Sequence, residues 1–394
     1  MVEELWHRER LRRSSEVMVV SMSALICLGL VMLYSVTAAQ AVGGAGGWAA
    51  LQKRLVWLLL GAVGLVIAWR ADLGFLARQY RWALVVAVAL LLLVFVPGLG
   101  VKINGARRWI RLGSQSLQPA EFAKWCLVVF VAGMAASLGR QLRDFRRGFL
   151  PASAAIGLVS ALIIVEPDFG TAALMGVVGG VLLLVAGARW AHLAAVGGAG
   201  ALCVALLVAR SPERLTRVFA FLEPEKYSQG AAYQQMQSLI ALGSGGMFGK
   251  GLGASGRKLF FLPEAPSDFI FAIIGEELGL IGALAVVALF AVFVFHGLRI
   301  ATLARDSFRA LVALGVTFAI GFQALINLAV VAGCAPTKGI ALPFISLGGS
   351  SLVAMMIGTG LVLAVARAEI AAAKAQATME PAMTGVLAEG VHHG

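Results

Sequence analysis

FIFAIIGEELGLIGALAVVALFAVFVFHG, residues 269–297, is an almost unbroken apolar run that carries two adjacent carboxylates. A run of more than about 18 apolar residues crosses a membrane as a helix, because lipid offers the backbone no hydrogen-bond partners. An unpaired carboxylate at that depth is costly. The run therefore predicts a membrane span whose acidic residues are protonated, paired or in contact with water.

Nine more apolar runs flank this one along the chain. They lie near 17–38, 55–69, 82–98, 122–138, 149–165, 170–187, 190–209, 308–333 and 347–366. Of the 394 residues, 60% are hydrophobic and only 13% are charged, which excludes an ordinary water-soluble fold. The sequence predicts an all-α polytopic membrane protein of about ten transmembrane helices.

The predicted helices form one membrane domain, residues 17–368, after an N-terminal segment, residues 1–16, and before an Ala-rich tail, residues 369–394, expected to be mobile. Lys and Arg beside helix ends indicate the cytoplasmic side. Arg8, Arg10, Arg12 and Arg13 therefore place the N-terminus in the cytoplasm, and ten crossings return the C-terminus there. Residues 210–268 then form a long extracytoplasmic loop between the seventh and eighth helices.

Basic residues also gather on the predicted outer side, against the usual bias. They are Lys102, Arg107, Arg108, Arg111, Arg210, Arg214, Arg217, Lys226, Lys250, Arg257, Lys258 and Lys338. Across the whole chain the basic residues are distributed among the membrane spans and do not form one patch on a soluble domain, which does not favour nucleic acid as a partner. An anionic ligand outside the membrane is the better explanation.

The long outer loop contains two patterned segments. YQQMQSLIAL, from residue 233, spaces its apolar residues like an amphipathic helix on the membrane interface, and we expect one or two short helices folded back onto the outer mouth. GLGASG, residues 251–256, follows no strand and so does not indicate a dinucleotide site. Its glycines allow a tight turn or bring backbone N–H groups close to an anion.

Asp268 stands at the outer start of the span that opened this section. Helix capping alone would explain a carboxylate there, since the helix dipole favours it by about 0.3–1 kcal/mol. Glu276 and Glu277 follow eight and nine residues later, about 12–14 Å deeper along a continuous helix. Together these acids predict one wall of a polar cavity open to the outside, with Asp268 as a candidate general base.

Three other segments carry candidate polar groups. In residues 104–124, Arg107 and Arg108 fit an interfacial anchor as well as a site, whereas Glu121 and Lys124 lie one helical turn apart and pair on one face. Asp168, near Glu166, is either a helix cap or a site residue.

The segment 334–352 contains prolines and glycines that exclude a regular helix throughout. Non-helical backbone at membrane depth must be buried in protein or line a cavity. Lys338, Ser350 and Ser351 could donate to phosphate oxygens there, although the serines fit helix caps equally well.

Five segments in order, NGARRWIRLG, QPAEFAK, EPDFGT, LPEAPSDFIFAIIGEELG and PTKGIALPFISLGGSS, resemble the signature segments of the SEDS family (shape, elongation, division and sporulation). PTKG ahead of LPFIS resembles the division branch more than the elongation branch. The resemblance implies a peptidoglycan glycosyltransferase of the bacterial inner membrane that polymerises lipid II at the outer face, with septal cell-wall synthesis as its setting.

The resemblance also assigns roles. Asp268 matches the essential carboxylate of the family and would take the proton from the attacking GlcNAc 4-hydroxyl, while undecaprenyl pyrophosphate leaves. The expected substrate-binding residues are Arg107, Arg108, Glu121, Lys124, Glu166, Asp168, Arg217, Lys338, Ser350 and Ser351, supported by Glu264, Glu276 and Glu277.

A class B penicillin-binding protein and other divisome proteins are the implied partners. No cofactor and no protein metal site is implied firmly, although a divalent cation, Mg²⁺ or Mn²⁺, suits the leaving group. Two alternatives remain at this stage, a lipid II flippase and a non-catalytic division scaffold. A transporter needs a path open alternately to both faces, whereas the unusual charges here gather on the outer side.

Overall fold

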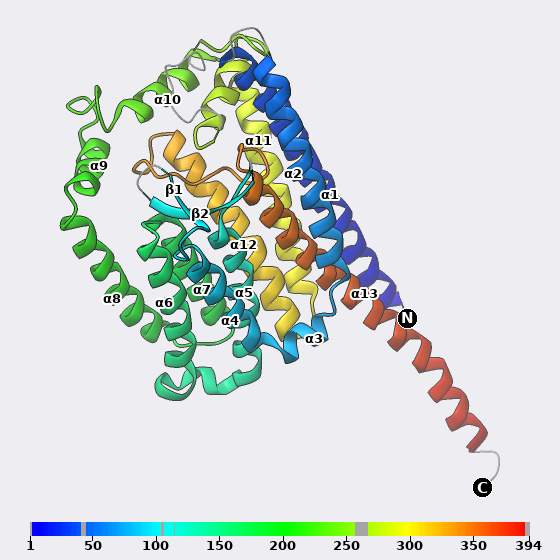
Figure 1. Ribbon diagram of the computed structural model, residues 1–394. Coiled ribbons are helices and arrows are strands. Elements are labelled where there is room, and N and C mark those ends of the chain that lie inside the picture. Colours follow the sequence, from blue (N-terminus) through cyan, green and yellow to red (C-terminus); the bar gives the residue numbers. More distant parts are fainter. Residues whose placement is uncertain (1, 41–44, 104–105, 114, 257–266, 391–394) are drawn as a thin grey trace.

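The computed structural model describes residues 2–40, 45–103, 106–113, 115–256 and 267–390. Within them, eight helices are long and apolar enough to cross a membrane. These are α1 (Val2–Gln40), α2 (Ala45–Arg70), α5 (Pro119–Leu138), α6 (Leu150–Val165) counted with the turn Phe145–Phe149 that leads into it, α8 (Trp190–Ala209), α11 (Ile270–Leu303), α12 (Ser307–Val331) and α13 (Gly349–Gly390). Two shorter apolar helices, α4 (Tyr80–Leu93) and α7 (Phe169–Val185), match the other two predicted spans. The predicted ten-helix architecture is confirmed (Figure 1).

The packing of the bundle brings the signature segments together. α13 lies along α2 and α1, while α12 contacts α5, α7, α11 and α13 (Figure 1). The core between these helices is almost entirely apolar, with Val128, Val316 and Met355 fully or nearly fully buried. In lipid this packing of close-fitting side chains and internal hydrogen bonds, rather than the hydrophobic effect, holds helices together.

Short elements connect the spans. α3 (Leu73–Arg78) is capped by Asp72, whose side chain accepts from the Gly74 N–H. A 3-10 turn, η1 (Gly139–Arg143), and a π turn, η2 (Phe145–Phe149), join α5 to α6, and Asp144 caps the second. Each of these connections lies on the side that the arginines predicted to be cytoplasmic.

A small antiparallel sheet, which the sequence did not predict, covers the outer side between α4 and α5. It contains β1 (Gly100–Ile103), β2 (Ala106–Leu112) and β3 (Gln115–Leu117), in the order β1-β2-β3. Along β2 the side chains of Ala106 and Ile110 are buried while Arg107 and Arg111 are exposed, the alternation expected of a strand with one face on protein. β2 contacts α5 and β3 contacts α13, so the sheet joins these helices at the outer side.

The long outer loop contains two helices, as predicted, α9 (Pro212–Leu222) and α10 (Tyr233–Ser244). α10 packs on α11 and α12, and the Ser238 hydroxyl donates to the Val331 carbonyl at 2.8 Å. The face of α10 that meets protein carries Gln235, Ser238 and Ala241, whereas Leu239 and Ile240 are exposed, so the position of this helix at the lipid interface stays a prediction. α8 and α9 stand at the edge of the molecule (Figure 1), and none of the α8 residues is buried.

α11 is broken at Gly279, which corrects the prediction of one continuous helix through residues 269–297. Gly279 has φ +69°, and a Cβ there would lie 2.3 Å from the Gly249 nitrogen, so only glycine fits. The interrupted ladder is completed by the outer loop, since Leu280 N–H donates to the Gly246 carbonyl at 2.9 Å and Lys250 N–H donates to the Glu276 carbonyl at 3.0 Å. The first nine residues of α11 thus pack with the outer loop.

Candidate active site

A buried ion pair lies in the first turns of α5. Lys124 Nζ is 2.8 Å from Glu121 Oε2 and donates to Gln323 Oε1 at 2.8 Å. The Lys124 side chain is only 1% exposed. Pro119 begins the helix, so Glu121 falls in its first turn, where the helix dipole favours a carboxylate. The predicted pairing of Glu121 with Lys124 is confirmed.

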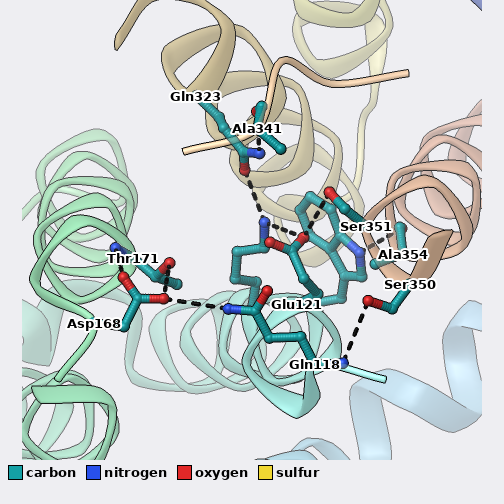
Figure 2. Close-up of polar contacts among 11 residues, drawn as sticks. Gln118, Glu121, Asp168, Thr171, Gln323, Ala341, Ser350, Ser351 and Ala354 are labelled. Carbon is teal, nitrogen blue, oxygen red and sulfur yellow. Dashed lines mark hydrogen bonds and ion pairs between the residues drawn. The ribbon is translucent and has the colours of Figure 1, made fainter. Parts of the chain in front are cut away.

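The N-terminus of α13 meets this pair (Figure 2). Ser351 Oγ donates to Glu121 Oε2 at 3.3 Å, and Ser350 Oγ accepts from the Gln118 N–H at 3.3 Å. Trp125 Nε1 donates to the Ala354 carbonyl at 2.6 Å and ties α13 to α5. Both serines therefore belong to the same polar cluster as Glu121 and Lys124.

Asp168 caps α7 and also faces this cluster. Its Oδ1 accepts from the Thr171 N–H at 3.1 Å, and its Oδ2 accepts from the Thr171 hydroxyl at 2.9 Å and from Gln118 Nε2 at 3.3 Å. Figure 2 shows Gln118 lying between Asp168 and Ser350. The capping alternative is thus correct, and the same carboxylate reaches the polar cluster.

The segment between α12 and α13 is non-helical, as its prolines and glycines predicted. Side chains from two helices hold its carbonyls: Gln323 Nε2 donates to Ala341 at 3.0 Å, and Asn327 Nδ2 donates to Ile340 at 2.7 Å. On the other side, the buried Arg54 of α2 donates to Phe344 at 2.9 Å and to Gly348 at 3.1 Å. Non-helical backbone at this depth is satisfied by protein groups, as it must be.

Sequence reasoning missed these three side chains, although signals for them existed. Gln323 and Asn327 are four residues apart on an otherwise apolar helix, a spacing that places both on one face. Arg54 lies in α2 directly before the apolar run 55–69, where a charge at the edge of a span indicates a functional or structural partner.

Asp268 is half-exposed and lies just before α11. Asn327 Nδ2 donates to the Asp268 carbonyl at 2.8 Å, and Ser346 Oγ donates to the Ser267 carbonyl at 2.6 Å. Asn327 and Gln323 thereby connect Asp268 to Lys124 through one face of α12. The candidate base and the buried ion pair belong to one arrangement at the outer ends of the helices.

Glu276 and Glu277 are paired, but away from this arrangement. Glu276 accepts from Lys250 Nζ at 2.8 Å, from Ser255 Oγ and from the Gly256 N–H at 3.3 Å. Glu277 accepts from the Gly253 N–H at 3.0 Å and from Ser35 Oγ at 2.9 Å.

These contacts correct the predicted depth of both carboxylates, because Ser35 lies near the outer end of α1 and the break at Gly279 interrupts the helix. The anion predicted for the GLGASG amides is supplied by the chain itself. Both glutamates anchor the outer loop instead of lining a cavity wall with Asp268.

Of the other predicted site residues, some are exposed and others hold the backbone. Arg107 is exposed on β2, and Lys338 is exposed next to Gly339. Arg108 Nε donates to the Glu166 carbonyl at 2.9 Å, so its guanidinium holds the turn between α6 and α7. Glu264 lies outside the described residues.

Arg217 is exposed on α9, and no contact joins it to the other candidates in the described part of the chain. Its neighbour Arg214 lies 4.0 Å from the centre of the Phe169 ring, directly after Asp168. Arg214 is therefore the residue of α9 that lies nearer the polar cluster.

Glu166 lies in the turn outside the spans and is fully buried, with no hydrogen-bond partner for its carboxyl oxygens among the described residues. Burial, together with the nearby Asp168 charge, raises the pKa of Glu166 to about 8, against an opposing effect of Arg108. The carboxyl is therefore mainly protonated at neutral pH. It is a poor anion ligand and a poor metal ligand in that state.

Replacing Glu166 by Gln is expected to stabilise the protein increasingly as pH rises. Because the folded pKa is raised from 4.5 to about 8, the glutamate costs no folding free energy below the lower value and progressively more between the two. The difference in thermal midpoint between Glu166→Gln and wild type should therefore be larger at about pH 9 than at about pH 5. The exposed Glu225→Gln is the control, and a pH-independent difference would contradict the buried neutral carboxyl.

Fold and site together define a class of protein. At one end of a bundle of apolar helices, the half-exposed Asp268 is linked through α12 to the buried Lys124–Glu121 pair. Ser350 and Ser351, at the N-terminus of α13, complete this polar cluster. This is the arrangement of a polytopic membrane protein with a polar site at one end of its helices.

Comparison with known proteins identifies the family. Residues 15–370 match the family model of FtsW, RodA and SpoVE, described as cell cycle protein, and the chain belongs to this family. Among curated relatives, a probable peptidoglycan glycosyltransferase FtsW of Trichlorobacter lovleyi is 39% identical over 364 residues, covering 92% of this chain and 96% of the relative. Stage V sporulation protein E of Bacillus subtilis is 38% identical over 344 residues, covering 87% and 94%.

Solved structures show the same fold. A chain from a study of the structural coordination of polymerization and crosslinking by a peptidoglycan synthase complex aligns with a TM-score of 0.74 at 28% identity, covering 89% of this chain and 97% of that one. The rod shape determining protein RodA of Thermus thermophilus aligns with a TM-score of 0.62 at 27% identity, covering 89% and 95%.

Proposed function

We propose that this protein is a peptidoglycan glycosyltransferase that polymerises lipid II at the outer face of the bacterial inner membrane. One observation carries the proposal: Asp268 is half-exposed at the outer ends of the helices and is joined through Asn327 and Gln323 to the buried Lys124–Glu121 pair. The relatives named peptidoglycan glycosyltransferase support it.

In the proposed reaction, Asp268 accepts the proton of the GlcNAc 4-hydroxyl on one lipid-linked sugar. The oxygen forms a bond to the anomeric carbon of the second sugar, and the bond from that carbon to the pyrophosphate breaks. Undecaprenyl pyrophosphate leaves with the electron pair. A half-exposed carboxylate is suited to this role, because it is accessible to a hydroxyl and can accept its proton.

Positive charge near the site would stabilise the leaving group. Lys338 is exposed directly beside Gly339, which faces the Asp268 carboxylate. Lys124 and the N-terminus of α13 add charge and dipole from within the protein. Arg107 on β2 and Arg214 on α9 extend the basic surface outward.

A divalent cation would be held mainly by the substrate. Mg²⁺ is often bound through one or two carboxylates together with substrate phosphates, not by a protein cage. In the described part of the chain no group of three or more His, Cys, Asp or Glu side chains is arranged to hold a metal. Asp168 is the carboxylate of the cluster that such an ion would meet, since Glu121 is already paired with Lys124.

The same proposal assigns a partner and a place. A class B penicillin-binding protein would crosslink the new strands, in line with the structural neighbour that comes from a complex combining polymerization and crosslinking. With both termini in the cytoplasm, Asp268 faces the compartment that holds the cell wall. The FtsW relatives favour a role at the division septum, and depletion is expected to give filaments rather than spheres.

Reconstitution with fluorescent lipid II tests the activity directly. The purified complex with its transpeptidase partner should convert lipid II into long glycan strands, seen as a ladder on a gel. Liposomes loaded with lipid II in the inner leaflet provide the transport arm of the test. Movement of lipid II across the bilayer without any polymer would favour the flippase, and neither activity would favour the scaffold.

A further inference from the structure

The main chain of Asp268 is fixed by one side chain. Asn327 Nδ2 donates to the Asp268 carbonyl at 2.8 Å and to the Ile340 carbonyl at 2.7 Å. One amide group thus joins Asp268, just before α11, to Ile340 in the non-helical segment between α12 and α13. Asn327 thus helps to set the distance between these two segments, together with the hydrogen bond from Ser346 to the Ser267 carbonyl.

The orientation of this amide is determined by its partners. An amide nitrogen can donate two hydrogen bonds, whereas an amide oxygen in its place would face two carbonyl oxygens. Asn327 Oδ1 is buried, and no described residue donates to it. The two donated hydrogen bonds therefore fix which way the amide points.

Gly339 makes room for the Asp268 carboxylate on the opposite side. A Cβ built on Gly339 would lie 3.0 Å from Asp268 Oδ2, which is closer than an ordinary contact between carbon and oxygen. Gly339 is itself exposed, and its neighbour Lys338 is exposed as well. The absence of a side chain at this position lets the carboxylate lie against the PTKG turn.

We propose that Asn327 and Gly339 are positioning residues that fix the Asp268 carboxylate in its reactive place without contacting the lipid-linked sugars. Asn327 holds the main chain of Asp268 from α12, and Gly339 leaves the space that its oxygen occupies. The inference rests on the proposed function, because it assumes that Asp268 is the base. It adds the residues that determine the geometry of that base.

Two substitutions test this inference in the reconstituted complex. Asn327→Leu keeps the approximate volume and removes both donated hydrogen bonds. Gly339→Ala adds one methyl group beside the carboxylate. Because a displacement of about 1 Å can reduce a rate about 10²-fold, each is expected to lower kcat about 10- to 100-fold while KM for lipid II changes less than about twofold.

Matched controls separate positioning from general damage. Thr317→Val removes a buried hydroxyl of the same helix α12, for which no partner is found among the described residues. Gly176→Ala adds a methyl group on α7 where the structure leaves open space. Both controls should keep the kcat of wild type, and all variants are compared by thermal midpoint and by co-purification with the partner.

The outcomes distinguish this inference from the function on which it rests. If Asp268→Asn is inactive but Gly339→Ala retains the kcat of wild type, the positioning inference is wrong and the proposed function stands. A rise in KM with unchanged kcat would indicate a substrate contact instead and would also overturn it. If Asn327→Leu does not fold, Gly339→Ala alone decides. If Asp268→Asn polymerises lipid II at the rate of wild type, Asp268 is not the base and the positioning inference fails with it. If the wild-type complex forms no polymer, the proposed function itself fails.

Discussion

Replacing Asp268 by asparagine is expected to reduce glycan polymerisation by about 10²- to 10⁴-fold, the usual contribution of a general base. Asparagine has nearly the same shape but cannot accept the proton of the attacking hydroxyl. Asp268 is half-exposed before α11, so the substitution does not remove a fully buried charge. The rate is measured as consumption of fluorescent lipid II by the purified complex.

The fold should survive this substitution, which makes the loss of rate informative. The Asp268 carbonyl that accepts from Asn327 belongs to the main chain and is retained in the variant. We expect the thermal midpoint and partner binding of wild type. Polymer formation at the rate of wild type would rule out Asp268 as the base.

Replacing Lys124 by methionine is expected to have the second large effect, on stability as well as on activity. Removing one partner of a buried ion pair costs about 3–5 kcal/mol, because the other charge is left buried without compensation. Here the remaining charge would be Glu121, whose side chain is only 8% exposed. The unfolding transition of the purified protein should shift strongly to lower temperature.

A double substitution separates the two consequences. Lys124→Met combined with Glu121→Gln removes both charges, and most of the lost stability should return. The activity should not return, because the positive charge beside the site is still missing. If the double variant polymerises lipid II like wild type, the pair serves only the fold.

The exposed pair of Lys226 and Glu223 provides the comparison for this experiment. These two side chains are 72% and 52% exposed, and they too are three residues apart. Replacing Lys226 by methionine should change stability by less than about 1 kcal/mol, as for other surface ion pairs. The contrast isolates the effect of burial from that of charge removal.

Much of the fold followed from the sequence, because lipid permits few alternatives. A backbone in hydrocarbon must satisfy its own hydrogen bonds, so apolar runs identify helices with little ambiguity. The short span α7 and the non-helical segment before α13 were both predicted on this basis. The sheet of residues 100–117 was not, because its short strands depend on contacts with α5 and α13 that lie elsewhere in the sequence.

The site was predictable where neighbouring residues form it. Glu121 and Lys124 pair within one turn, and a local rule was sufficient. Contacts between distant segments were missed: Asn327 reaches Asp268, and Arg54 reaches Phe344. Glu276 was given the wrong depth because a single glycine, Gly279, breaks the helix, and glycine inside an apolar run is usually tolerated without a break.

The guanidinium of Arg54 has a consequence for how the protein is made. Its two acceptors, the carbonyls of Phe344 and Gly348, lie 290 and 294 residues later in the chain. At a synthesis rate of about 5–20 residues per second, α2 leaves the ribosome roughly 15–60 s before these acceptors exist. During insertion the newly made α2 therefore carries a charge whose two protein acceptors exist only once residues 344–348 have been synthesised.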